Sequence, residues 1–91
     1  MTPEFRADLL LAVDQQLLSP ETPYVAKTYQ RLLALGLDEA AAKYQIVYCL
    51  CEEMEQILKT HRSFSEKSYR AALKNLPIAL DIENEENENQ V

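Results

Sequence analysis

With 91 residues and an apolar fraction of 47%, the chain is long enough for one domain and too apolar for an intrinsically disordered protein. A single glycine and four prolines leave few turn residues, which disfavours a β-sheet and favours helices. The net charge of −6 is uneven, because residues 83–91 hold four acids and no base while residues 1–82 hold eleven acids and nine bases. The nearly neutral body excludes an acidic mimic of DNA, and we expect residues 83–91 to form a disordered acidic tail behind a single helical domain, residues 1–82.

No stretch of the chain approaches the roughly 20 apolar residues of a membrane span. The first ten residues, MTPEFRADLL, lack the basic segment and apolar run of a signal peptide. Cys49 and Cys51 are two residues apart, so a disulfide could not connect distant parts of the fold. We therefore expect a protein of the reducing cytoplasm, with no membrane contact.

The first predicted helix spans residues 3–18. Thr2 can cap it, and the fixed φ of Pro3 suits the first turn. One broad arc is apolar at helical spacing and should face the core: Phe5, Leu9, Leu10, Ala12, Val13 and Leu17. Leu11 and Leu18, seven residues apart, form a second apolar line beside Ala7 and are candidate interface residues.

The second predicted helix begins at Pro23, with Thr22 as its N-cap, and ends at Gly36, the one residue that adopts a left-handed conformation without cost. Its buried face should consist of Val25, Thr28, Tyr29, Leu32, Leu33 and Leu35. Its outward face should carry Lys27, Gln30 and Arg31.

The third predicted helix is the longest, from the N-cap Asp38 to about Thr60. Its main apolar stripe contains Ile46, Val47, Leu50, Met54, Ile57 and Leu58. Glu53 lies within this stripe by helical phase. Since a buried carboxylate needs a partner, we expect an arginine, lysine or tyrosine from another helix to pair with it, unless Glu53 lies at the stripe's edge.

Tyr44 and Tyr48 lie one turn apart, on the side of this helix opposite Ile46 and Leu50. Either other helices pack on several of its faces or a partner protein covers the two tyrosines. The first interpretation is favoured, since a long central helix is normal in a small bundle. Exposed tyrosines are also enriched at interfaces, so both residues are candidate interface residues.

No pattern in the chain indicates catalysis or a cofactor. The two sulfurs of a Cys-x-Cys pair in a helix point about 200° apart, and the single histidine, His61, completes no ligand set. There is no glycine-rich phosphate loop and no nucleophile beside a histidine. We expect no enzyme activity, no metal and no cofactor; a reactive thiol at Cys51 is a separate hypothesis.

The fourth predicted helix starts either at Ser63, as a capping box with Glu66, or at Ser65, with Phe64 and Tyr69 as a hydrophobic staple; the second is favoured. It should reach about residue 75 and be stopped by Pro77. Its buried side chains should be Tyr69, Ala72, Leu73 and Leu76. The alternation of Ile78, Leu80 and Ile82 then predicts a short extended segment across the bundle.

Lys67, Arg70 and Lys74 share one face of this helix, within a stretch, residues 59–74, that holds five bases and one acid. Such a face could bind phosphate groups, although a solvated helix face is the usual explanation, and the acidic tail could fold back on it. No aromatic interleaving accompanies the bases, so nothing indicates that nucleic-acid bases are read. These three residues are candidate anion-binding residues.

Residues 33–40 resemble the helix–Leu-Gly-Leu–helix turn of ubiquitin-associated domains and of some helix-turn-helix proteins, although the third helix is too long for the former. Across residues 20–77 the pattern Pro20-Glu21, Arg31-Leu32, Gly36, Glu39-Ala40 and Leu76-Pro77 looks like that of small bacterial helical proteins of unknown function. This resemblance implies an all-α fold and no assigned activity.

Together these patterns predict an all-α fold, a compact bundle of four helices with a long third helix. The leading functional hypothesis is a protein–protein interaction module that self-associates, as a homodimer burying Leu11 and Leu18, Tyr44 and Tyr48, or both pairs. The alternative is an accessory protein that contacts nucleic acid or other polyanions through the basic face of the fourth helix.

Overall fold

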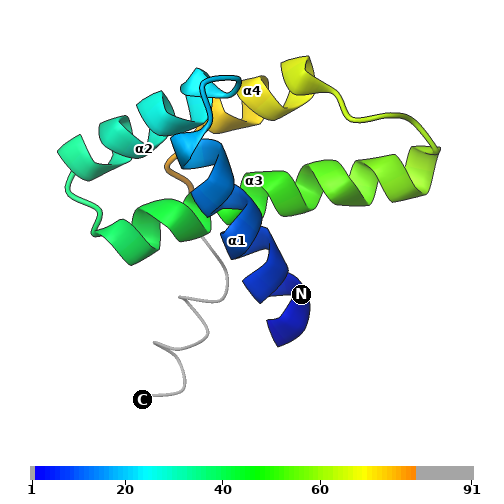
Figure 1. The fold of residues 1–91 in the computed structure, drawn as a ribbon, viewed down its shortest axis with the longest axis horizontal. Helices are drawn as coiled ribbons and strands as arrows, with labels where there is room; N and C mark the ends of the chain where they lie inside the picture. The colour runs from blue at the N-terminus through cyan, green and yellow to red at the C-terminus, as the bar shows by residue number, and fades with distance from the viewer. Residues whose placement is uncertain (1, 80–91) are drawn as a thin grey trace.

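The computed structural model describes residues 2–79, which fold into four α-helices (Figure 1). These are α1 (Pro3–Leu18), α2 (Pro23–Ala34), α3 (Glu39–Thr60) and α4 (Glu66–Lys74). Within residues 2–79 there is no β-strand. The predicted all-α bundle with a long third helix is confirmed.

Three of the four helices begin at the side-chain cap that their sequences predict. The side chains of Thr2, Asp38 and Ser65 each accept a hydrogen bond from the backbone N–H three residues on, at 3.1, 2.8 and 3.1 Å. Ser65, rather than Ser63, therefore caps α4. Thr22 is the N-cap residue of α2, as predicted, but its side chain makes no capping hydrogen bond. Its hydroxyl instead donates to the carbonyl oxygen of Gln16 at 2.8 Å and ties the end of α1 to the start of α2.

Two residues with positive φ end the central helices. Gly36, with φ 106°, follows α2 as predicted, and His61, with φ 54°, takes the left-handed conformation directly after α3. Leu35, predicted to be buried, is 59% exposed, because it lies beyond the last turn of α2, where no other helix covers it. Leu58 was likewise placed in the buried stripe, but it lies in the last turn of α3 and is 73% exposed.

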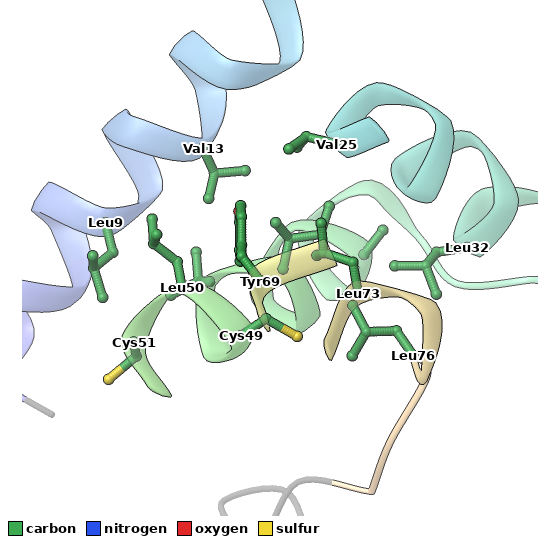
Figure 2. Close-up of a cluster of buried hydrophobic side chains, with 13 residues drawn as sticks. Leu9, Val13, Val25, Leu32, Cys49, Leu50, Cys51, Tyr69, Leu73 and Leu76 are labelled. Carbon is green, nitrogen blue, oxygen red and sulfur yellow. The ribbon is translucent and has the colours of Figure 1, made fainter. Parts of the chain in front are cut away.

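The core forms where α1, α2 and α4 all pack against α3 (Figure 2). In Figure 1, α1 crosses α3, while α4 doubles back along it. Tyr69 of α4 is almost fully buried, and its ring meets those of Tyr24 and Phe64 edge-on, with centroids 6.1 and 5.7 Å away. Its hydroxyl donates to Oε1 of Gln16 at 2.7 Å, so the polar end of this core residue is satisfied.

An extended segment follows α4 and lies against the bundle. The side-chain amide of Gln45, buried in α3, donates to the carbonyl oxygen of Ile78 at 2.8 Å and accepts from its N–H at 2.9 Å. The guanidinium of Arg31 donates to the carbonyl oxygens of Leu73 at 2.9 Å and Leu76 at 2.6 Å, which caps the C-terminal end of α4. The predictions for Leu80, Ile82 and the tail, residues 83–91, lie outside the described residues.

No helix in the described part of the chain is long and apolar enough to cross a membrane.

Candidate functional site

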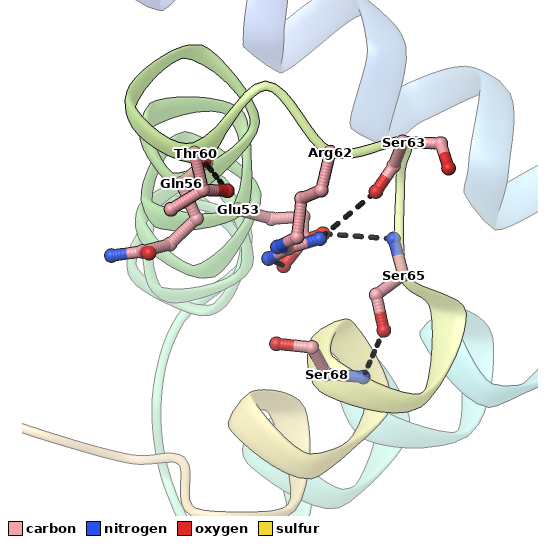
Figure 3. A network of polar contacts seen from close by, with 7 residues as sticks. All are labelled: Glu53, Gln56, Thr60, Arg62, Ser63, Ser65 and Ser68. Carbon is pink, nitrogen blue, oxygen red and sulfur yellow. Dashed lines mark hydrogen bonds and ion pairs between the residues drawn. The ribbon is translucent and has the colours of Figure 1, made fainter.

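Glu53 is the one carboxylate buried in the described part of the chain, with 4% of its surface exposed. Its two oxygens accept a bidentate pair from Arg62, at 2.7 and 3.0 Å, and Oε2 also accepts from the backbone N–H of Ser65 at 2.9 Å (Figure 3). Arg62 donates in addition to the carbonyl oxygen of Ser63 at 3.0 Å. The carboxylate therefore fixes both the connection between α3 and α4 and the first turn of α4.

The hydrogen bonds from Arg62 lower the pKa of Glu53 from 4.5 to about 2. Burial of the carboxyl group acts in the opposite direction, and the backbone N–H of Ser65 and the side chain of Ser68 add to the lowering. A carboxyl group with so low a pKa stays ionised at neutral pH, so it has no proton to donate as a general acid and is only a weak base. This arrangement is that of a structural ion pair.

The sequence correctly placed Glu53 inside the bundle, and an arginine is indeed its partner. The expected location of that partner was wrong, since Arg62 lies in the connection after α3 rather than in another helix. The left-handed conformation of His61 turns the chain sharply, so a residue only nine positions away reaches back to the same carboxylate.

Cys49 and Cys51 are both buried and form no disulfide. Their sulfurs point away from each other in Figure 2. Burial raises the pKa of Cys49 to about 12 and also raises that of Cys51, so both thiols are protonated at neutral pH. This disfavours the hypothesis of a reactive thiol at Cys51, because the thiolate is the nucleophile.

No group of three or more histidine, cysteine, aspartate or glutamate side chains within residues 2–79 is arranged to hold a metal ion.

The outer line of α1 is the most apolar exposed surface among the candidate sites. Leu11 is 59% exposed and Leu18 is 87% exposed, while Leu9 and Val13 on the other side of the helix are buried. Seven residues separate the two exposed leucines, which places them on one face, two turns or about 10 Å apart. Asp14, beside the two leucines on the surface of α1, forms an ion pair with Lys43 of α3 at 2.9 Å, so Lys43 partly neutralises its charge.

The other two candidate interface residues, Tyr44 and Tyr48, are half-buried. The guanidinium of Arg6, in α1, lies 5.9 Å from the centre of the Tyr44 ring. Since α1, α2 and α4 all contact α3, the favoured interpretation, that helices pack on several faces of the long helix, agrees with this arrangement. The two tyrosines therefore offer less free surface than Leu11 and Leu18.

The three candidate anion-binding residues are all exposed, but they differ in their contacts. Arg70 lies over the ring of Tyr24, 5.0 Å from its centre, and 3.6 Å from the carboxylate of Glu66. Lys67 and Lys74 form no ion pair within residues 2–79. On the predicted basic face, Arg70 is therefore already in contact with Tyr24 and Glu66, whereas Lys67 and Lys74 are exposed and form no ion pair within residues 2–79.

Two polar residues with structural roles were missed by the sequence reasoning. Arg31 was expected only to point outward, and Gln45 was not singled out. Arg31 does lie on an exposed position, yet its long side chain reaches the end of α4. Gln45 gave no usable signal, because its position one before Ile46 turns it about 100° away from that residue and outside the predicted stripe.

Comparison of the chain with protein-family models, with curated proteins and with solved structures finds no significant match. The resemblance to small bacterial helical proteins therefore stays an expectation from the sequence.

Proposed function

We propose that this protein is a helical protein–protein interaction module that self-associates through the outer face of α1. The observation that carries the proposal is the exposure of Leu11 and Leu18 on one line of a helix whose opposite side is buried in the core. Exposed apolar side chains that share one face of a helix favour an interface, because covering them removes apolar area from water.

The geometry of α1 suits a two-fold dimer. Two copies of the helix can place Leu11 and Leu18 against the same pair in the partner, so one patch serves both subunits. The seven-residue separation is that of equivalent positions in a coiled-coil heptad, in which side chains from two helices interdigitate. The chain would then act by holding two copies, or a copy and a helical partner, together.

The test is the molecular mass of the full chain as a function of concentration, measured by sedimentation equilibrium. We expect the unmodified protein to form a dimer and the double variant Leu11→Glu with Leu18→Glu to be a folded monomer, since four buried carboxylates would then face one another. A matched control is Leu35→Glu with Leu58→Glu, which introduces the same charge at two other exposed leucines. A monomer at high concentration in the unmodified protein would end the proposal.

A second candidate function is contact with nucleic acid or other polyanions through Lys67, Arg70 and Lys74 of α4. It is favoured by the exposure of all three side chains and by the two lysines that form no ion pair within the described residues. Retention on an immobilised nucleic acid that is lost at modest salt would support this candidate. No retention at low salt would reject it.

A further inference from the structure

Basic side chains from two helices gather where α2 lies beside α4. One shallow surface groove is lined by two basic residues from each helix: Lys27 and Arg31 of α2, and Arg70 and Lys74 of α4. Its other lining residues are Tyr24, Thr28 and Leu73, so none of the residues that line the groove is acidic. The basic face predicted on α4 alone is thus one wall of a surface built by two helices.

The contacts between α2 and α4 show how the two walls are aligned. Tyr24, in the first turn of α2, meets Arg70, and Arg31, two turns later, reaches the carbonyl oxygen of Leu76. The two helices therefore run in the same direction, side by side (Figure 1). One turn along from the contact between Tyr24 and Arg70, Lys27 of α2 and Lys74 of α4 line the same groove.

The four cations are not equally available to a ligand. Arg31 already uses both terminal nitrogens to cap α4. Arg70 lies over the Tyr24 ring, 5.0 Å from its centre, and a contact through the face of the ring consumes none of the five N–H donors of the guanidinium. Its contact with Glu66 is an exposed pair between residues one turn apart, which is weak. Lys27 and Lys74 form no ion pair within residues 2–79.

We propose that this groove binds a compact anion bearing two or more phosphate groups, held by Lys27, Arg70 and Lys74. Arg70, which lies over the Tyr24 ring, supplies a planar fork that matches phosphate oxygens, and the two lysines supply point charges on flexible stems. The proposal rests on the second candidate function and deepens it, because it names the ligand class and adds Lys27 of α2 to the site.

The structure favours a compact anion over a nucleic-acid polymer for two reasons. The one aromatic residue in the groove, Tyr24, has Arg70 over its ring, so a base could not stack on that face without displacing the guanidinium. A polymer would also extend beyond the groove, over a body (residues 1–82) whose eleven acids and nine bases offer no excess of positive charge, whereas at a Debye length of about 8 Å a compact anion interacts mainly with the nearby cations.

The experiment is a calorimetric titration of the full chain with inorganic tripolyphosphate at an ionic strength of about 0.15 M. We expect saturable binding to one site, and we expect Lys27→Gln and Lys74→Gln each to weaken it about fivefold. The matched control is Lys59→Gln, which makes the same charge change at an exposed residue that does not line the groove. Arg70→Lys keeps the charge but removes the fork, and it should also weaken binding.

Each other result overturns the proposal in a distinguishable way. Absence of tripolyphosphate binding rejects the compact ligand, and if nucleic acid is still retained at low salt, the second candidate function survives without it. If Lys27→Gln binds tripolyphosphate as well as Lys59→Gln does, while Lys74→Gln binds it more weakly, then Lys27 takes no part and the anion binds to α4 alone. Binding that is equal in all variants would show that the anion does not bind in this groove.

Discussion

Two regions of this molecule place side chains against their usual preference. Inside the bundle, Glu53 and Gln45 are polar and buried; on the outer face of α1, Leu11 and Leu18 are apolar and exposed. Every buried side-chain nitrogen or oxygen within the described residues has a hydrogen-bond partner, so the fold itself accounts for the polar residues inside. Leu18 lies at the end of α1, but Leu11 lies in the middle of the helix, and both stay exposed within residues 2–79, which is why the functional proposal rests on them.

The buried polar side chains hold the two ends of α4 in place. Glu53 holds the backbone at the start of α4, and Gln45 holds the backbone of Ile78 after its end. Arg31 adds a third contact, at the C-terminal carbonyl oxygens of α4. All three side chains bind main-chain atoms, so they fix the short helix α4 and the segment after it against the longer helices.

The largest effect should come from breaking the carboxylate contact. Glu53→Ala leaves the guanidinium of Arg62 without its partner and removes the acceptor of the Ser65 N–H, so we expect a loss of about 3–5 kcal/mol in the free energy of unfolding. Chemical denaturation measures this change. Glu52→Ala, at an exposed neighbouring position, is the matched control and should cost under about 0.5 kcal/mol. Similar values for both variants would show that Glu53 is not buried and paired.

The pH dependence of stability gives a second measure of the same contact. Because the pKa of Glu53 is lowered from 4.5 to about 2 on folding, the unfolded chain binds more protons than the folded one between these values. The stabilisation is therefore complete above about pH 4.5 and is lost as the pH falls through 2, by about 3 kcal/mol in all. Glu53→Gln should lack this part of the acid dependence, and an unchanged profile in that variant would contradict the assignment.

Truncation tests whether the segment after α4 belongs to the buried polar region. Removing residues 78–91 leaves both ends of the Gln45 amide without a partner, and we expect a loss of about 1–3 kcal/mol. Removing only residues 83–91, the acidic stretch without apolar anchors, should change the free energy of unfolding by under about 0.5 kcal/mol. Thermal or chemical denaturation of the two truncated chains decides this, and equal losses would mean that Ile78 contributes nothing.

The helices themselves could be predicted from the sequence because their signals are local. Thr2, Asp38 and Ser65 each act on the first turn of their own helix, and Gly36 acts on the end of its own. The burial of Glu53 could be predicted for the same reason, since helical phase alone places it in the stripe. Local signals also identified Leu11 and Leu18 as a line separate from the core.

The contacts between helices could not be predicted in this way. The partner of Glu53 depends on how sharply the chain turns at His61, and the contact of Gln45 with Ile78 joins residues 33 positions apart. Leu35 and Leu58 have the right helical phase for burial, but their exposure depends on where the neighbouring helices end. The groove between α2 and α4 likewise needs the packing of two helices and has no signature in either one alone.

The smallest expected effect concerns the exposed leucines, and it separates an interface from a core. At a protein concentration low enough to favour the monomer, Leu11→Glu with Leu18→Glu should change the free energy of unfolding by under about 0.5 kcal/mol, since both side chains are already in water. Leu9→Glu, on the opposite side of the same helix, would bury an unpaired charge and should prevent stable folding. If the exposed pair also unfolds the protein, the two leucines belong to the core and α1 is covered on both sides. If the double variant leaves the stability of the monomer unchanged but does not dimerise at high concentration, Leu11 and Leu18 contribute to association and not to folding.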